Sequence, residues 1–316
     1  MNPIEENTEA SLCEPVIPSP DRREVDEAEI SSRQARVLAL VASLMWSSSG
    51  FFVKSPYFIG WPGPLLALWR AVFACIVLWP MVRRPRWSWW LIPMAMFFAA
   101  MNYTYLTAMV EGTAANAIWL QCTAPVWVLL VGVFGFRETA SARDWLMVAF
   151  AMLGVGVIIF YEARGVSLDS VAWGLASGVM YAAVVLSLRH LRGLNAVWLA
   201  AVNHSVTALV LLPVAFANAP FPRGMQWIFL AGLGILQMAV PYVLFARSLK
   251  RIPGHEATGI GLIEPLLVPT WAYLAWGDRP EWWTILGGGF ILAGLAIRYL
   301  TPIRRTRVAE PPDAEA

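Results

Sequence analysis

Residues 123–138 read TAPVWVLLVGVFGFRE, and residues 263–278 read IEPLLVPTWAYLAWGD. A shift of 140 positions places Pro125 on Pro265 and Glu138 on Asp278 without a gap. Each stretch is an apolar run with the proline inside a helix-length segment and the carboxylate where the apolar run stops. Because a self-match at a fixed offset is the mark of an internal repeat, the sequence predicts two copies of one structural unit.

The composition indicates a protein that lives in a lipid bilayer. Of the 316 residues, 58% are hydrophobic and 14% are charged, whereas soluble domains carry roughly 25% charged residues. The 17 tryptophans and 15 phenylalanines suit the aromatic belts of a membrane protein. Cys13, Cys75 and Cys122 lie far apart, so neither a disulfide framework nor a zinc pattern is indicated. The net charge of +2 gives no reason to expect nucleic acid as a partner.

Ten apolar segments follow one another along the chain. Each is near the ~20 residues that a helix needs to cross a bilayer. Their approximate bounds are 37–57, 63–82, 88–109, 113–134, 143–161, 170–188, 196–217, 226–247, 256–276 and 282–300. The polar residues 1–36 and 301–316 are expected to be tails, the first of them disordered. The sequence therefore predicts an all-α integral membrane protein with ten transmembrane helices.

The charges in the short loops predict the orientation of these helices. If the N-terminus is cytoplasmic, the cytoplasmic tails and loops hold 18 Lys and Arg residues and the outer loops hold 4. We therefore expect both tails in the cytoplasm. The first repeat spans 37–162 and the second spans 168–300, with five segments each. Because five is odd, the second copy must enter the membrane from the opposite side, and inverted repeats are typical of secondary transporters.

Four motifs then carry a resemblance to a known family. The first segment contains ALVASLMWSSSGFFVK (39–54), and the second contains a lone arginine, Arg70. The fourth and ninth carry the proline followed thirteen residues later by an acid, and the fifth and tenth read LGVGV and LAGLA. With these motifs the chain, over roughly 37–300, resembles the drug/metabolite transporter superfamily and its ten-helix EamA-type exporters. It is also similar to the YddG-type amino-acid exporters, although Asp278 stands where the family usually has Glu. The resemblance implies export of amino acids, metabolites or amphipathic toxic compounds.

Two charged residues inside the segments are candidates for substrate binding or coupling. Glu264 is about nine residues, or ~13 Å, into its helix, and precedes Pro265, which frees a backbone acceptor nearby. Glu264 could respond to protons or cations, bind a substrate amine, or be a structural acid paired with Arg70 or a backbone donor. Arg70 could clamp a substrate carboxylate, since guanidinium suits bidentate recognition, or be the fixed partner of Glu264.

Polar and aromatic residues recur at helical spacing on the other segments, as expected for a cavity that takes amphipathic solutes. The substrate-cavity candidates are Trp46, Ser47, Asn102, Tyr105, Asn116, Trp119, Tyr181, Gln237 and Glu264. The alternative for each of them is hydrogen bonding between helices. His204 is interpreted as a packing residue. Glu138 and Asp278 could latch the two mouths of a transporter, but we favour a role as N-terminal charges for the helices that follow them.

The function predicted from these patterns is export of small metabolites across the bacterial inner membrane by alternating access. Aromatic or neutral amino acids are the first substrate class. The alternatives are efflux of drugs or toxic cations, a membrane-embedded enzyme or lipid-handling protein, and a scaffold that transports nothing. No nucleophile cluster, ligand set or phosphate loop is visible, so we expect no enzyme, cofactor or metal site. The expected partners are a small-molecule substrate and the bilayer, with a homodimer compatible with the sequence. Proton antiport and facilitated diffusion both stay open.

Overall fold

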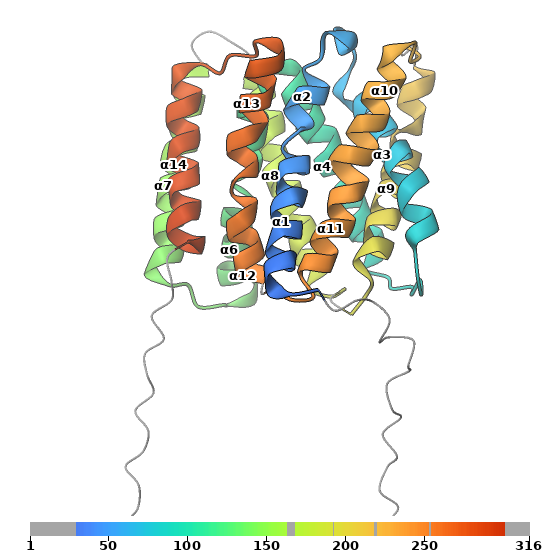
Figure 1. Ribbon diagram of the computed structural model, residues 1–316. Helices are drawn as coiled ribbons and strands as arrows, with labels where there is room; N and C mark the ends of the chain where they lie inside the picture. The colour runs from blue at the N-terminus through green and yellow to red at the C-terminus, as the bar shows by residue number, and fades with distance from the viewer. Residues whose placement is uncertain (1–29, 163–167, 192, 218–219, 253, 301–316) are drawn as a thin grey trace, which may run out of the picture.

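A computed structural model describes residues 30–162, 168–191, 193–217, 220–252 and 254–300. Within them, long helices run side by side in one bundle (Figure 1). The first half contains α1 (Ser32–Trp46), α2 (Ser49–Val53), α3 (Gly63–Leu78), α4 (Leu91–Glu111), α5 (Ala114–Gln121), α6 (Ala124–Phe136) and α7 (Ala142–Glu162). The second half contains α8 (Leu168–Leu188), α9 (Ala196–Phe216), α10 (Met225–Ala231), a π-helical segment (Gly232–Ala239), α11 (Val240–Ser248), α12 (Gly254–Gly261), α13 (Glu264–Trp276) and α14 (Trp282–Tyr299).

The helices confirm the prediction of an all-α membrane protein. Each of the ten predicted segments coincides with one long helix or with consecutive shorter ones. By length and apolar composition, seven stretches of the described residues could cross a membrane: Ser32–Val53, Gly63–Met81, Ala114–Phe136, Ala142–Glu162, Leu168–Leu188, Ala196–Phe216 and Met225–Ser248. The other three predicted segments, 88–109, 256–276 and 282–300, are also helical, so the number of ten crossings stays a prediction.

The surface of the bundle explains why the chain is helical. Large apolar side chains such as Phe134, Leu274 and Ile228 are exposed on its outside. In hydrocarbon no water can satisfy backbone polar groups, so a chain with such a surface satisfies them within helices. The inside is packed with apolar side chains and a set of buried polar ones, among them Arg70, Asn102 and His204. These buried polar groups define where a functional site can lie.

The repeat found in the sequence is kept by the helix boundaries. A shift of 140 moves α5 onto α12 and α6 onto α13, with all four pairs of end residues matching. In both copies the apolar segment is broken in the middle, at residues 122–123 and 262–263. The new helix then begins with Pro125 or Pro265 in its first turn, where a missing N–H costs no helical hydrogen bond. The two copies are thus broken at the same place by the same residue type.

The ends of α6 and α13 also share one geometry. Each helix ends on a left-handed residue, Arg137 with φ of 56° and Gly277 with φ of 72°. The following residue then folds back, because Glu138 N–H donates to Gly132 O at 3.0 Å and Asp278 N–H to Ala272 O at 3.4 Å. The shift of 140 relates every residue in these two motifs. Each copy therefore presents a carboxylate at an equivalent helix end.

Contacts at the helix ends show that α1–α2 and α8 run in opposite directions. Lys54, directly after α2, pairs with Asp278, and Asp278 accepts a hydrogen bond from the N–H of Ala114 at the start of α5. Arg189, directly after α8, pairs with Glu138 beyond the far end of α6. The first segment therefore ends at the upper face of Figure 1 and the sixth at the lower face, as two inverted copies require. The start of α1 and the end of α14 both lie at the lower face (Figure 1).

Close contact between α7 and α14 depends on small residues. A Cβ on Gly154 would lie 2.3 Å from the Gly287 carbonyl oxygen, and one on Gly287 would lie 2.6 Å from that of Gly154. Gly156 lies two residues further along α7, and a Cβ there would meet only open space. Glycines at such an interface let helix backbones approach closely. The pair joins the last helix of each half.

We expect opposite effects of the same substitution at the two α7 glycines. Gly154→Ala should lower stability by about 1–3 kcal/mol, because the added methyl group overpacks a rigid backbone contact. Gly156→Ala should leave stability unchanged or raise it by about 0.5–1 kcal/mol, since alanine is the better helix former. Thermal unfolding of the purified variants in detergent measures both. Equal unfolding temperatures would contradict the close contact between α7 and α14.

Candidate functional site

A buried arginine lies at the centre of the bundle. Arg70 on α3 is 1% exposed, and its Nη2 donates to Asn102 Oδ1 on α4. Its Nη1 donates to Gln237 Oε1 in the π-helical segment at 3.4 Å, and its Nε has no partner. Among the described residues no carboxylate lies within ion-pairing distance of it. The guanidinium is therefore a buried cation held by neutral amide oxygens, with one donor free.

The helices around Arg70 are shaped to hold this arrangement. Asn102 Nδ2 donates to Phe98 O at 2.7 Å, which turns the amide oxygen of Asn102 toward Arg70. Gly234 allows the π-helical segment to approach α3, since a Cβ there would lie 2.7 Å from the backbone oxygen of Arg70. Gln237 Nε2 donates to Trp46 O at 3.2 Å, where α1 ends. Short π-helical stretches are frequent at functional sites, and this one places Gln237 between two helices.

The break between α1 and α2 contributes a second group of polar side chains. Tyr105 OH lies 3.2 Å from Ser49 Oγ, and Trp271 Nε1 donates to Ser47 Oγ at 2.9 Å. Trp46 is partly exposed and packs edge-on against the ring of Tyr242, with centroids 5.4 Å apart. The sequence placed Trp46, Ser47 and Tyr105 near a cavity, and the structure brings them close to Asn102 and Gln237. Tyr242 was missed, although it follows Pro241 in an otherwise apolar run.

Glu264 is the acidic counterpart of Arg70 in this region, but the two do not pair. Glu264 is the first residue of α13 and is partly exposed. It is close enough to interact electrostatically with Tyr105, Tyr181 and Tyr242, and Arg70 interacts with Tyr105 and Tyr242 as well. Tyr181 on α8 is 43% exposed although it has these interior neighbours. The side chains of Glu264 and Tyr181 are therefore both accessible, at least in part.

Two of the predicted cavity residues, Asn116 and Trp119, have hydrogen-bond partners away from Arg70. Asn116 Nδ2 donates to Glu162 Oε1 at 3.0 Å, and Trp283 Nε1 donates to the same oxygen at 3.3 Å. Trp119 Nε1 donates to Pro265 O at 2.8 Å. Neither Asn116 nor Trp119 contacts Arg70. Glu162 is a buried carboxylate that could not be singled out from the sequence, because it lies at the very end of its apolar segment.

His204 is buried in a nearby aromatic setting. Both of its ring nitrogens are without a hydrogen-bond partner, and its ring packs edge-on against Phe98 and Tyr242 at 5.1 and 6.1 Å. The adjacent Asn203 also has an unpartnered oxygen. The packing role expected for His204 from the sequence stays a prediction.

Glu138 and Asp278 do not act as the N-terminal charges favoured above. Asp278 pairs with Lys54 at 3.3 Å, and the helix N–H that it accepts is that of Ala114 on α5, not one of the following helix. Glu138 pairs with Arg189 at 2.7 Å. The sequence could not show this, because each partner is far away along the chain and meets the acid only in the folded bundle.

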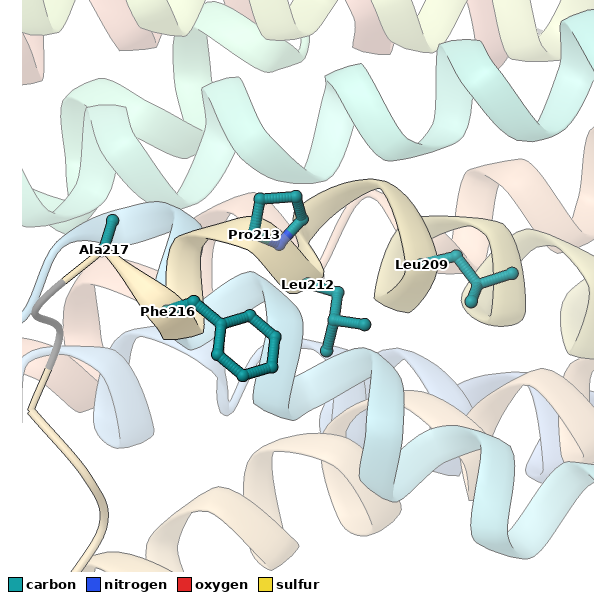
Figure 2. A pocket seen from close by; sticks show the side chains of 5 residues that line it. All are labelled: Leu209, Leu212, Pro213, Phe216 and Ala217. Carbon is teal, nitrogen blue, oxygen red and sulfur yellow. The ribbon is translucent and has the colours of Figure 1, made fainter.

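The surface also carries an apolar pocket, which is lined by side chains of a single helix. Leu209, Leu212, Pro213, Phe216 and Ala217 line it at the end of α9 (Figure 2). Its volume is about 450 Å³. It offers no polar side chain that could recognise a charged metabolite. We therefore place the candidate site at Arg70 and Glu264 and not here.

Two helical copies around buried charges define a multi-pass membrane protein of the two-repeat type. The EamA-like transporter family matches the chain twice, over residues 34–160 and 169–300. The chain belongs to this family.

Its relatives share the description of transporter. An uncharacterized transporter of Archaeoglobus fulgidus is 27% identical over 210 residues, covering 66% of this chain and 76% of the relative. Uncharacterized transporter YxxF of Bacillus subtilis is 26% identical over 217 residues, covering 66% and 68%. A crystal structure described only as that of a protein matches with a TM-score of 0.55 at 20% identity, covering 85% of this chain and 98% of its own. This structural match shows the fold alone.

We expect the stability of the bundle to depend on the acceptor that Asn102 offers to Arg70. Asn102→Leu should lower stability by about 1.5–3 kcal/mol, because a buried charged donor loses its hydrogen bond. Asn102→Asp has nearly the same shape and supplies a counter-charge, so it should keep or raise stability. Thermal unfolding of both purified variants measures the difference. A protein that tolerates leucine as well as aspartate would contradict a buried guanidinium at this place.

Proposed function

We propose that this protein is a secondary transporter that exports small metabolites across the bacterial inner membrane by alternating access. Its substrates are aromatic or neutral amino acids and similar amphipathic compounds. The path lies between two inverted five-helix repeats with ten crossings in all. Membership of the EamA-like transporter family and the opposite directions of α1–α2 and α8 support this architecture. The surplus of Lys and Arg in the loops of one face supports cytoplasmic termini.

The observation that carries the substrate class is the unpaired charge of Arg70. A buried cation without a counter-ion is costly, and a bound carboxylate would offset that cost. Its free Nε and its fork geometry suit a carboxylate. Glu264, at a separate position beside Tyr105 and Tyr242, supplies a negative charge for an ammonium group. The two charges together complement a zwitterion, and the rings of Trp46 and Tyr242 complement an apolar side chain.

Efflux of organic cations is the second candidate. The observation that favours it is the partly exposed Glu264 with three tyrosines near it, since aromatic faces and a carboxylate attract cations. The two candidate functions differ in the role of Arg70. An amino-acid exporter needs it to bind a carboxylate, whereas a cation exporter does not.

A matched pair of substrates separates these candidates. Purified protein in liposomes should transport tryptophan at least about tenfold better than tryptamine, which lacks the carboxylate, since a charge-assisted hydrogen bond is worth about 1.5–3 kcal/mol. Arg70→Gln should remove most of this preference by impairing tryptophan transport alone. Transport is measured as the uptake of radiolabelled substrate.

The matched control is Arg223→Gln, which changes an exposed arginine in a loop. It should keep the preference of the wild-type protein. Preferred transport of tryptamine by the wild-type protein would favour cation efflux. Transport of neither compound, nor of any other amino acid in a panel, would overturn the proposal.

Glu264 is the residue that we expect to couple transport to protons. If it binds the proton, Glu264→Gln should abolish the response of transport to a pH gradient but leave downhill substrate exchange intact, because the amide cannot exchange a proton. The measurement compares uptake with and without an imposed gradient. Glu281→Gln, at an exposed acid before α14, serves as the control and should behave like the wild-type protein.

Two other results are informative. A folded Glu264→Gln protein with wild-type rate and wild-type pH response would exclude Glu264 from the transport path. Loss of folded protein would instead assign it a structural role.

A further inference from the structure

The two ion pairs at the ends of the bundle occupy equivalent positions in the two repeats. A shift of 135 positions moves Trp46 to Tyr181, the last residue of α2, Val53, to the last residue of α8, Leu188, and Lys54 to Arg189. The shift of 140 moves Glu138 to Asp278. Each pair therefore joins the base after the first segment of one repeat to the acid after the fourth segment of the other.

The upper pair is part of a tight network. Lys54 Nζ lies 3.3 Å from Asp278 Oδ1 and also donates to the backbone oxygen of Gly112. Asp278 Oδ2 accepts the N–H of Ala114 at 2.9 Å. Both charged side chains are only 16% exposed. This one pair therefore ties together the ends of α2, α4, α5 and α13.

Aromatic rings close the same end of the molecule. Trp276 Nε1 donates to Phe51 O at 2.6 Å, and the two rings have centroids 5.4 Å apart. Phe229 from α10 stacks on Phe51 at 5.8 Å and contacts Tyr57 at 4.9 Å. These rings therefore join α2, α10 and α13 at the end of the bundle that carries the Lys54–Asp278 pair.

The lower pair is looser. Arg189 Nη1 lies 2.7 Å from Glu138 Oε1, with the two side chains 32% and 49% exposed. The residue equivalent to Trp276 is Phe136, which is 57% exposed, and the Arg189 guanidinium lies 5.9 Å from its ring. In the part of the chain that the structure describes, neither charged side chain makes a further hydrogen bond that ties in a third helix. The upper ion pair is therefore more buried and has more hydrogen bonds than the lower one.

We propose that Lys54–Asp278 and Arg189–Glu138 are the two gate latches of the transport cycle, and that the first holds the upper mouth closed in this conformation. Each pair bridges the two repeats at the place where they must part for a mouth to open. Opening one mouth breaks its own pair and leaves the other pair intact. The inference rests on the proposed alternating access, and it assigns positioning roles to four residues that need not touch substrate.

The test uses the cysteine that the chain already has near the site. Cys122 lies at the break between α5 and α6, is partly exposed, and is close enough to Glu264 to interact with it. With Cys13→Ser and Cys75→Ser in place, a membrane-impermeant maleimide reports access to Cys122 from one side at a time. Intact cells expose one face to the reagent, and inverted membrane vesicles expose the other.

For the upper latch we expect Asp278→Asn to raise the labelling rate of Cys122 from the Lys54 side by about tenfold and to lower it from the other side, because a partly buried charge-assisted contact is lost. Asparagine can still accept the N–H of Ala114, so the start of α5 keeps its partner. Lys54→Gln should have the same effect, and the double variant should add nothing to either single change. Glu281→Gln is the control and should label like the parent protein.

For the lower latch, Glu138→Gln and Arg189→Gln should each raise labelling from the Arg189 side by only about twofold to fivefold, as expected for an exposed pair. Unchanged labelling from both sides in folded Asp278→Asn and Lys54→Gln proteins, or fully additive effects of these two changes, would overturn the latches.

This failure differs from a failure of the proposed function. If wild-type protein in liposomes transports no amino acid or amine, the substrate proposal falls, yet the labelling pattern still shows whether the pairs control access. If transport is normal and labelling is insensitive to all four substitutions, only the proposed role of the two ion pairs as latches is disproved.

Discussion

The charge of Arg70 is the constraint on which the centre of this protein depends. Moving a guanidinium out of water costs several kcal/mol unless its donors are satisfied. Here three elements supply what is needed, because Asn102 comes from α4, Gln237 from the π-helical segment, and Gln237 in turn binds the backbone at the end of α1. A change in the register of any of these elements would break at least one hydrogen bond of this network. The polar centre therefore fixes the helices that surround it.

Much of the fold could be predicted from the sequence, because its signals are local or repeated. Apolar runs of bilayer length mark the helical segments, and the two prolines with their trailing acids mark the two copies. The break at residues 122–123 and its equivalent follow from those prolines, since a proline is best tolerated in the first turn of a new helix. The number of crossings is less certain from composition, because three segments carry more polar or small residues than the rest.

The site could be predicted only in part, because the spacing of residues on one helix does not show which other helix packs against that face. Asn102 and Asn116 are both asparagines inside apolar segments, yet one holds Arg70 and the other binds Glu162. Spacing shows that Asn116 and Trp119 share a face, but not that this face meets α7, α13 and α14. Lys54 and Arg189 gave no local hint of their acids, which lie 224 and 51 residues away in the chain. Such pairings depend on tertiary contacts alone.

The two repeats are equivalent in backbone design but not in side chains, and the difference is largest at the two ion pairs. Both copies end α6 or α13 on a left-handed residue and then present an acid to a base of the other copy. A perfectly symmetric pair of repeats would have two equally stable mouths. Trp276, two residues before Asp278, donates a hydrogen bond to Phe51 O, whereas the equivalent Phe136 is exposed near Arg189. Under the proposed alternating access, these differences at equivalent positions would favour closure at the upper face, and the common backbone design would allow the opposite state.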